Sequence, residues 1–384
     1  MSSLFLYRLR TRVPLGRGWV VETARQLRDL PAQTALDNNT QEQMEPLMDD
    51  FGRFHNYLRM SLTEKCNFRC QYCMPEEGVH LTPKTALMTV EERKRSLRLF
   101  HELGVTKVRF TGGEPTLSKD LEELVGYAKS LPGIHSVGMT SNGLVLSDKV
   151  DKLMKAGLDS VNISLDTLQT DKFEKLTRRR GTALRRVLAS IYAAKAAGMT
   201  NVKINCVLMA GVNDDEVPDF LQLGKDAEVD VRFIEFMPFS GNDWIGKRQL
   251  LPYKEVLHSL HREGMNLETV PSDDRSDTTK WYTQPGVEAS ISRVGFITSM
   301  TDHFCGSCNR IRITADGRFR SCLFGKDDFS LTTAFREGQD DEHVAGLVGY
   351  ALGNKHGSLG GHTLQTLGQE AAGAGDRPMI LIGG

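Results

Sequence analysis

Six of the seven cysteines fall into two groups of three, near opposite ends of the 384-residue chain. The first group, Cys66, Cys70 and Cys73, has the spacing C-x3-C-x2-C. The second has the spacing C-x2-C-x13-C and contains Cys305, Cys308 and Cys322. Four protein ligands usually close a structural zinc or iron–sulfur site, so three thiolates leave one metal position open. Because an open position can bind a substrate or cofactor, the two groups predict two metal centres that do chemistry.

The first cysteine group favours iron–sulfur over zinc. Its short spacings let one loop wrap a compact cluster, and an aromatic residue, Tyr72, precedes the last cysteine. A zinc site would need a fourth ligand, and the nearest histidines, His55 and His80, are not at the usual zinc spacing. The seventh cysteine, Cys206, lies in the apolar run 202–209 and is predicted to be buried in the core.

The composition is that of an ordinary globular protein, with 40% hydrophobic residues, 25% charged residues and a net charge of −1. This balance predicts no nucleic-acid partner, and no apolar run approaches the roughly 20 residues that span a bilayer, so no membrane partner is predicted. A polyanionic substrate would therefore need local basic residues. The clustered cysteines are typical of metal sites in a reducing compartment.

The first 49 residues are predicted to form an extension. Four arginines precede the first acidic residue: Arg8, Arg10, Arg12 and Arg17. An arginine-rich, acid-poor start is typical of an organelle transit peptide and predicts the mitochondrial matrix. The alternative is a disordered, non-targeting extension of a cytoplasmic protein. Residues 37–50 are polar and have the composition of a linker.

From about residue 55, strand patterns alternate with helix patterns. Strands are predicted at residues 57–62, 107–110, 136–140, 160–165, 202–208 and 231–236. Helices are predicted at residues 89–103, 117–130, 147–156, 183–197, 214–226 and 331–352. Helix ends are predicted at Gly104, Gly157 and Gly198, each of which follows the last apolar turn. Alternation of this kind predicts parallel strands with crossover helices. Six such units would form an incomplete barrel or a strongly curved open sheet. The predicted fold is α/β: an incomplete parallel (β/α)6 TIM-like barrel over residues 50–275, and a C-terminal α+β domain over 276–384 that carries the second cluster.

Polar and glycine-rich segments lie just past several predicted strands. They are Gly112-Gly113-Glu114-Pro115, Thr140-Ser141-Asn142-Gly143, Ser164-Leu165-Asp166 and Met237-Pro238. Active sites of barrels of this type lie at the C-terminal ends of the strands, so these segments are expected to meet there. Three consecutive arginines at positions 178–180 are predicted to be a solvated helix end.

The first cysteine loop and the segment Gly112-Gly113-Glu114-Pro115 resemble the radical S-adenosylmethionine superfamily. The resemblance implies a [4Fe–4S] cluster held by Cys66, Cys70 and Cys73. It implies that the fourth iron chelates the amino and carboxylate groups of S-adenosylmethionine, which is cleaved to a 5′-deoxyadenosyl radical. Glycines allow close backbone approach to such a ligand.

The second cysteine group, with Arg310 and Arg312 beside it, is similar to the GTP-cyclising branch of that superfamily, as is the terminal Gly383-Gly384. The resemblance runs from about residue 50 to 384, is weaker over 338–375 and is absent from the first 45 residues. It implies a second [4Fe–4S] cluster whose open iron binds guanine. The implied product is (8S)-3′,8-cyclo-7,8-dihydroguanosine 5′-triphosphate, formed in the first step of molybdenum cofactor biosynthesis.

The resemblance also implies roles for single residues. The implied S-adenosylmethionine contacts are Tyr72, Gly113, Ser164 and Met237. The implied GTP contacts are Arg59, Arg109, Thr140, Lys203, Arg310 and Arg312. The implied catalytic residues are Arg59, Arg310, Arg312, Gly383 and Gly384. Five of these side chains are cations, which suits a triphosphate bearing about four charges.

Further partners follow from the resemblance alone: an electron donor and a downstream pterin synthase. It also allows a homodimer. Two alternatives remain open at this point. One is a different radical S-adenosylmethionine enzyme with an auxiliary cluster, although such enzymes usually carry more C-terminal cysteines. The other is a non-enzymatic iron–sulfur or zinc module.

Overall fold

A computed structural model describes residues 45–237, 239, 249–272, 274–364, 366–367 and 378–383. Residues from Glu45 onward belong to one compact unit, with Leu47 already buried. The predicted extension ended at residue 49, so the last residues assigned to it belong to this unit. Residues 1–44, which carry the predicted transit peptide, lie outside the described part. None of the helices in the described part is long and apolar enough to cross a membrane.

The described strands form one sheet in the order β12-β11-β10-β1-β2-β3-β4-β5-β6-β9-β8-β7. Their bounds are β1 Tyr57–Ser61, β2 Lys107–Thr111, β3 Ser136–Ser141, β4 Ser160–Ser164, β5 Asn201–Leu208, β6 Asp230–Glu235, β7 Glu268–Val270, β8 Thr279–Thr283, β9 Val294–Ile297, β10 Arg310–Ile313, β11 Arg318–Arg320 and β12 Phe329–Ser330. The run from β10 through β1–β6 to β9 is parallel throughout, and the outer pairings are antiparallel.

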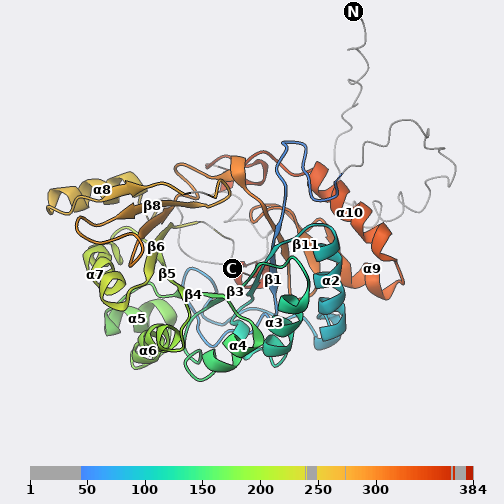
Figure 1. Ribbon diagram of the computed structural model, residues 1–384, viewed down its shortest axis with the longest axis horizontal. Coiled ribbons are helices and arrows are strands. Elements are labelled where there is room, and N and C mark those ends of the chain that lie inside the picture. Colours follow the sequence, from blue (N-terminus) through green and yellow to red (C-terminus); the bar gives the residue numbers. More distant parts are fainter. Residues whose placement is uncertain are drawn as a thin grey trace, which may run out of the picture. The chain divides into compact units, whose positions relative to one another are not determined.

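Helices connect the parallel strands β1–β6 and also occur in the later part of the chain. Their bounds are α2 Val90–Glu102, α3 Leu121–Ser130, α4 Val150–Ala156, α5 Thr170–Thr177, α6 Ala183–Ala196, α7 Val217–Ala227, α8 Tyr253–Arg262, α9 Leu331–Arg336, α10 Asp341–Gly353 and α12 Met379–Ile382. Short 3-10 turns include η4, Cys305–Ser307. Figure 1 shows β1 and β3–β6 following an arc, with α2–α7 along its outer side.

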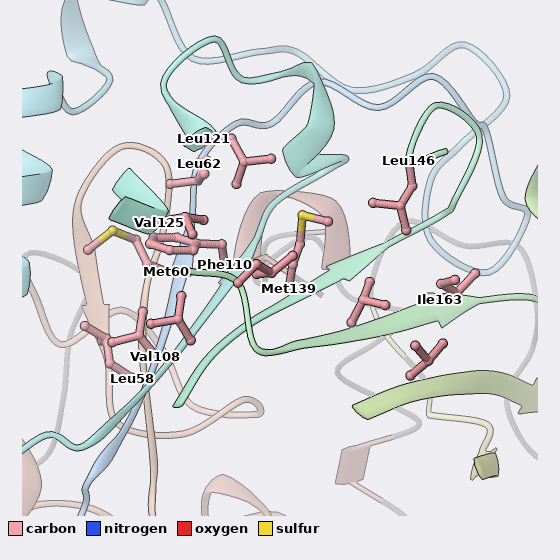
Figure 2. Close-up of a cluster of buried hydrophobic side chains, with 14 of the residues drawn as sticks. Leu58, Met60, Leu62, Val108, Phe110, Leu121, Val125, Met139, Leu146 and Ile163 are labelled. Atoms are coloured by element: carbon pink, nitrogen blue, oxygen red, sulfur yellow. The ribbon is translucent and has the colours of Figure 1, made fainter. Parts of the chain in front are cut away.

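The main core lies between the sheet and these helices. Successive side chains of a strand point to opposite faces. On β1 the buried Leu58 and Met60 therefore share one face, and Val108 and Phe110 of β2 extend it. Figure 2 shows these side chains with those of α3. The alternate residues, which include Arg59 and Arg109, occupy the opposite, inner face of the sheet.

All six predicted strands are present, and each boundary agrees within one residue. The predicted helix ends at Gly104, Gly157 and Gly198 also have positive φ angles, which favour glycine. Helix α5 was not predicted. The predicted helix over residues 331–352 is wrong, because two helices, α9 and α10, occupy this stretch.

Strands from the C-terminal part extend both edges of the same sheet, since β10 pairs with β1 and β9 pairs with β6. One sheet therefore continues across the predicted boundary between residues 275 and 276. This arrangement places the residues after Cys308 directly beside β1, where Tyr57 N donates to Asn309 O at 3.2 Å.

The break between α9 and α10 has a local cause. Gly338 has φ +81° and ends α9, while the side chain of Asp340 accepts a hydrogen bond from His343 N and begins α10. A left-handed residue followed by an aspartate N-cap stops one helix and starts the next.

We predict that Gly338→Ala destabilises the protein by about 1–2 kcal/mol, because an L-residue is strained at positive φ. The matched control is Gly346→Ala within α10. An added Cβ meets nothing within 4 Å at either glycine. Alanine at position 346 should raise stability by up to about 1 kcal/mol, because it favours the helix. The midpoint of urea denaturation measures both. Equal effects of the two substitutions would contradict this explanation of the break.

Candidate active site

Two rows of cationic side chains cross the inner face of the sheet. In the first row, Arg59 of β1 pairs with Arg312 of β10 on one side and Arg109 of β2 on the other. In the second row, Tyr57 lies between Arg310 and Lys107. The strand register thus brings four of the five predicted cations together. We call the two rows of side chains the arginine rows. Their arginines are Arg59, Arg109, Arg310 and Arg312.

Tyr57 lies among these cations. Its hydroxyl accepts a 2.5 Å hydrogen bond from Arg109 Nε, and Lys107 and Arg310 lie over its ring. Burial raises the pKa of Tyr57, but Arg109, Arg59 and Arg310 outweigh it and lower the pKa to about 7. Burial also lowers the pKa of Arg59 to about 10, with repulsion from Arg109 and Arg310 adding to the effect. The rows therefore favour an anion.

Several polar atoms on the inner face are buried without a hydrogen-bond partner among the described residues. They are Ser61 Oγ, Thr111 Oγ1, Thr140 Oγ1, Asn162 Oδ1, Arg310 Nη1 and Arg312 Nη1. Buried polar groups are nearly always satisfied by protein, ligand or ordered water, so a cluster of unsatisfied ones on one face suits a polar ligand or bound water. The set includes three residues for which the sequence resemblance implied GTP contacts: Thr140, Arg310 and Arg312.

Arg109 and Lys203 differ from Arg310 and Arg312, because Nη1 of the latter two is buried without a hydrogen-bond partner among the described residues, whereas no side-chain nitrogen of Arg109 or Lys203 is. Arg109 donates to Tyr57, to Met139 O at 2.9 Å and to Ser160 Oγ at 3.3 Å. Lys203 Nζ donates to Asp230 Oδ2 at 3.0 Å. A Cβ on Gly138 would lie 2.7 Å from Arg109 Nη2, so this glycine gives the guanidinium its space.

Arg232 is an inner-face cation that the sequence reasoning missed. It lies on β6 and donates to Asn205 Oδ1 at 2.7 and 3.0 Å. Burial lowers its pKa to about 10, and repulsion from Arg109 adds to the shift. Its place two residues after Asp230 in an alternating strand was a signal that could have identified it.

The first cysteine loop follows the carboxyl end of β1 and is held by arginines. Arg178 Nη1 donates to Arg69 O and Met74 O at 3.2 and 3.0 Å, and Arg179 Nε donates to Asn67 O at 2.5 Å. The prediction of a solvated helix end at residues 178–180 is therefore wrong for these two residues. The carbonyls of a tight loop need donors, and these guanidiniums supply them.

The segment Gly112-Gly113-Glu114 packs against the same loop. Gly113 N donates to Thr63 O at 2.6 Å and Glu114 N to Lys65 O at 2.8 Å. A Cβ on Gly113 would lie 2.4 Å from Lys65 O. Close approach to the protein's own backbone thus accounts for this glycine, alongside the ligand approach that the sequence suggested.

The Glu114 carboxylate links this segment to the end of β3. It accepts hydrogen bonds from Thr116, from Ser141 Oγ at 2.8 Å and from Asn142 N at 2.7 Å. Asn142 Nδ2 in turn donates to Asn67 Oδ1 at 2.6 Å and to Cys66 Sγ at 3.8 Å. The ends of β2 and β3 therefore position the first cysteine.

Tyr72 and Asp166 form a buried pair beside the first cysteine group. Tyr72 donates to Asp166 Oδ2 at 2.9 Å, and Val207 N donates to the other carboxylate oxygen at 2.9 Å. Burial raises the pKa of Asp166 to about 6. Burial, Cys66 and Asp166 raise the pKa of Cys73 to about 12. Thiols with raised pKa values in close electrostatic contact need a bound cation to ionise, which suits a metal cluster.

The remaining predicted cofactor contacts are Ser164 and Met237. Ser164 ends β4, and Met237 follows β6 and packs against a small apolar cluster that includes Met300 and Leu359. Cys206 is fully buried in the main core, as predicted. Within the described residues, no three His, Cys, Asp or Glu side chains converge closely enough to hold a single metal ion. Cysteines that bind different irons of one cluster need not converge in this way.

The second cysteine group lies near the amino end of β10. Arg53 Nη1 donates to Cys305 O at 2.7 Å, and Lys355 Nζ donates to Cys308 Sγ at 3.8 Å. Burial raises the pKa of Cys308, but Lys355 and Arg310 outweigh it and lower the pKa overall. The loops of Cys66 and Cys308 therefore lie beyond opposite ends of the β1–β10 pair, with the arginine rows between them.

The chain end reaches the inner face at the carboxyl ends of β1 and β2. Gly383 has φ +86°, and an added Cβ would lie 2.8 Å from Ser61 Cβ and 3.1 Å from Thr111 Oγ1. Both side chains carry unpartnered buried oxygens within the described structure. Gly384 lies outside the described residues.

Comparison with known proteins agrees with these features. Residues 60–224 match the family described as Radical SAM superfamily, and residues 229–359 match Molybdenum Cofactor Synthesis C. A mitochondrial GTP 3′,8-cyclase of Arabidopsis thaliana is 48% identical over 338 residues, which is 88% of this chain and 83% of that protein. Molybdenum cofactor biosynthesis protein 1 of Drosophila melanogaster is 50% identical over 311 residues, which is 81% of this chain and 54% of that protein.

The chain thus spans about half the length of the Drosophila relative. Among solved structures, Streptococcus suis SuiB bound to the precursor peptide SuiA gives a TM-score of 0.53 at 15% identity, covering 81% of this chain and 67% of that chain. At that identity the likeness shows a shared fold. The extensive identity to the Arabidopsis protein shows that this chain belongs to the GTP 3′,8-cyclase family of the radical S-adenosylmethionine superfamily.

Proposed function

We propose that this protein converts GTP to (8S)-3′,8-cyclo-7,8-dihydroguanosine 5′-triphosphate, the first step of molybdenum cofactor biosynthesis. The observation that carries the proposal is the pair of arginine rows, with unpartnered buried donors on Arg310 and Arg312, between the two cysteine loops. A polyanion bound there would satisfy those donors. Membership of the family supports this activity over the alternatives of another radical enzyme or a non-enzymatic module.

The first cysteine group fits the cofactors of its superfamily, a [4Fe–4S] cluster and S-adenosylmethionine. Cys66, Cys70 and Cys73 would hold the cluster, which would supply the electron for reductive cleavage of S-adenosylmethionine. Phe68 N and Asn142 Nδ2 donate to Cys66 Sγ and would stabilise its thiolate. The proposed S-adenosylmethionine contacts are Tyr72, Gly113, Ser164 and Met237.

We propose that Cys305, Cys308 and Cys322 hold a second [4Fe–4S] cluster, with an open iron position for the guanine base. The triphosphate would lie on the inner face against Arg59, Arg310 and Arg312. Thr140 would add a hydroxyl contact, while Arg109 and Lys203 would add positive charge from their fixed positions. Desolvated charge-assisted hydrogen bonds of this kind are among the strongest polar contacts.

The finer architecture belongs to the same proposal. We propose that β1–β6 and their helices form an incomplete (β/α)6 barrel within residues 50–275. We propose that residues 276–384 act as the second-cluster domain, although they share its sheet. An electron donor, a downstream pterin synthase and a homodimer are the proposed partners. The mitochondrial matrix is the proposed compartment, supported by the Arabidopsis relative's name and the arginines before residue 18.

The central test is anaerobic incubation with GTP, S-adenosylmethionine and reductant, followed by liquid chromatography and mass spectrometry. One hydrogen atom would pass from GTP to the 5′-deoxyadenosyl radical to give 5′-deoxyadenosine, and one electron from the added reductant and one proton would return to the nucleotide. The product is therefore an isomer of GTP with its own retention time. Its absence from preparations with about eight irons per chain would refute the proposal.

Two cysteine variants distinguish the roles of the two cysteine groups in the same assay. Cys70→Ser should abolish cleavage of S-adenosylmethionine, because the cluster that supplies the electron is lost. Cys308→Ser should keep uncoupled cleavage and lose cyclisation. Cyclisation that persists in Cys308→Ser would show that the second cysteine group has no part in the reaction.

We predict that Arg312→Gln weakens GTP binding by about 10- to 150-fold, the value of one charge-assisted hydrogen bond of roughly 1.5–3 kcal/mol. Arg95→Gln is the control, because Arg95 lies on α2 and pairs with Asp341 at 2.8 Å, outside the inner face. Equilibrium dialysis with the nucleotide measures both variants. A similar loss in the two variants would indicate a nonspecific charge effect.

We predict that Gly383→Ala lowers turnover much more than GTP affinity. The new Cβ would be strained at positive φ and would press on Ser61 at the end of β1. Gly346→Ala, which meets open space, is the matched control. Single-turnover kinetics separate the two effects. A large rise in the dissociation constant of GTP with unchanged turnover would contradict a catalytic role for the tail.

A further inference from the structure

A buried polar cluster adjoins the second cysteine group. Residues 45–56, which precede β1, form a strap closed by a bridge between Met48 and Phe54. Three polar side chains of this strap, those of Asp49, Arg53 and His55, are buried. Arg53 and His55 contact the chain that follows α10, where Lys355 is 6% exposed. Buried charged groups are costly unless they are paired and hydrogen-bonded, so the loss of any one of these contacts would destabilise the polar cluster.

Arg53 fixes the backbone on both sides of the cluster. Its Nε donates to Asp49 Oδ2 at 2.6 Å, and Nη1 donates to Cys305 O at 2.7 Å and Gly357 O at 2.9 Å. Nη2 also donates to His356 O at 3.0 Å. A guanidinium paired with a carboxylate and holding three carbonyls is a rigid connection. It ties the turn that carries Cys305 to the segment that carries Lys355.

His55 orients the Lys355 ammonium. His55 Nδ1 lies 3.1 Å from Leu47 O, and a carbonyl can only accept, so Nδ1 carries the hydrogen. His55 Nε2 is then the acceptor for Lys355 Nζ at 2.6 Å. Two further acceptors lie near Nζ: Arg310 O at 3.5 Å and Cys308 Sγ at 3.8 Å. The three donors of the ammonium thus have three acceptors, one of which is the cysteine sulfur.

The three cysteines of the group are not equivalent in this respect. Cys308 Sγ is contacted by the buried Lys355 Nζ, whereas Cys305 Sγ receives the backbone N–H of Leu359 at 3.5 Å. Hydrogen bonds to the sulfurs and nearby charge are two of the factors that set the reduction potential of an iron–sulfur cluster. Partners of this kind also hold a ligand in its binding orientation.

We infer that Lys355, oriented by His55, is a positioning residue that donates a hydrogen bond to the Cys308 thiolate and raises the reduction potential of the cluster on the second cysteine group. The inference rests on the proposed second cluster. An N–H donor withdraws electron density from the thiolate, so the reduced cluster is stabilised relative to the oxidised one. Through His55, the strap would therefore influence the reduction potential of the second cluster.

The experiment uses the full chain with Cys70→Ser, so that only the second cluster contributes to the signal. Iron and sulfide analysis and an electron paramagnetic resonance titration against solution potential are carried out anaerobically. Lys355→Met should keep the cluster and shift its midpoint potential to a more negative value. Lys355→Arg, which keeps an N–H donor, should lie nearer the parent. Lys149→Met is the control, because Lys149 Nζ donates to Thr116 O, outside the second cysteine group.

Each outcome has a definite meaning. A retained cluster with an unchanged potential in Lys355→Met overturns the inference. If Lys355→Met loses iron, Lys355→Gln is compared: retention of the cluster by this amide donor supports the positioning role, and equal loss overturns it. Should the Cys70→Ser parent hold no iron removable by Cys308→Ser, the proposed second cluster itself fails, which distinguishes that result from a failure of the Lys355 inference.

Discussion

The pairing of β10 with β1 is the interaction on which the site depends. It sets Arg312 beside Arg59, and the β1–β2 pairing adds Arg109 to the same row. Neighbouring strands lie about 4.8 Å apart. At about 5 Å, two like charges repel by roughly 3 kcal/mol at an effective dielectric constant of 20. Tyr57 offsets part of this repulsion through its contact with Arg109. The remaining positive charge favours the binding of an anion on this face.

The same strand pair separates the two cysteine loops. Cys66 follows the carboxyl end of β1, and Cys308 precedes the amino end of β10, which runs parallel to it. A five-residue strand is about 16 Å long at roughly 3.3 Å per residue. The length of β1 therefore sets the space between the loops. Two small molecules arranged end to end, one held by each loop, would fill a space of this length.

Sequence patterns predicted the strands and most helices because apolar periodicity and glycine helix ends are local signals. The two cysteine groups and the four arginines of the arginine rows were also identified in advance, by spacing and by resemblance, whereas the inner-face Arg232 was missed. Register was not predictable, since the pairing of β10 with β1 joins residues about 250 positions apart. The roles of Arg178 and Arg179 were missed because their acceptors are loop carbonyls, which leave no trace in the sequence. Gly338 was a local signal that the apolar pattern of the flanking helices obscured.

The glycines near the site show that one glycine can be required for two physical reasons. Gly113 lies so close to Lys65 O that any side chain would displace the cysteine loop, whatever ligand is bound. Gly138 gives space to the Arg109 guanidinium, and Gly383 approaches Ser61 at the carboxyl end of β1. In each case, the absent side chain lets a backbone or a cation occupy a fixed position beside the inner face. The loops and cations that pack against these glycines would also form the walls of the ligand site. The same glycines therefore serve both the close packing of the protein and the space for a ligand.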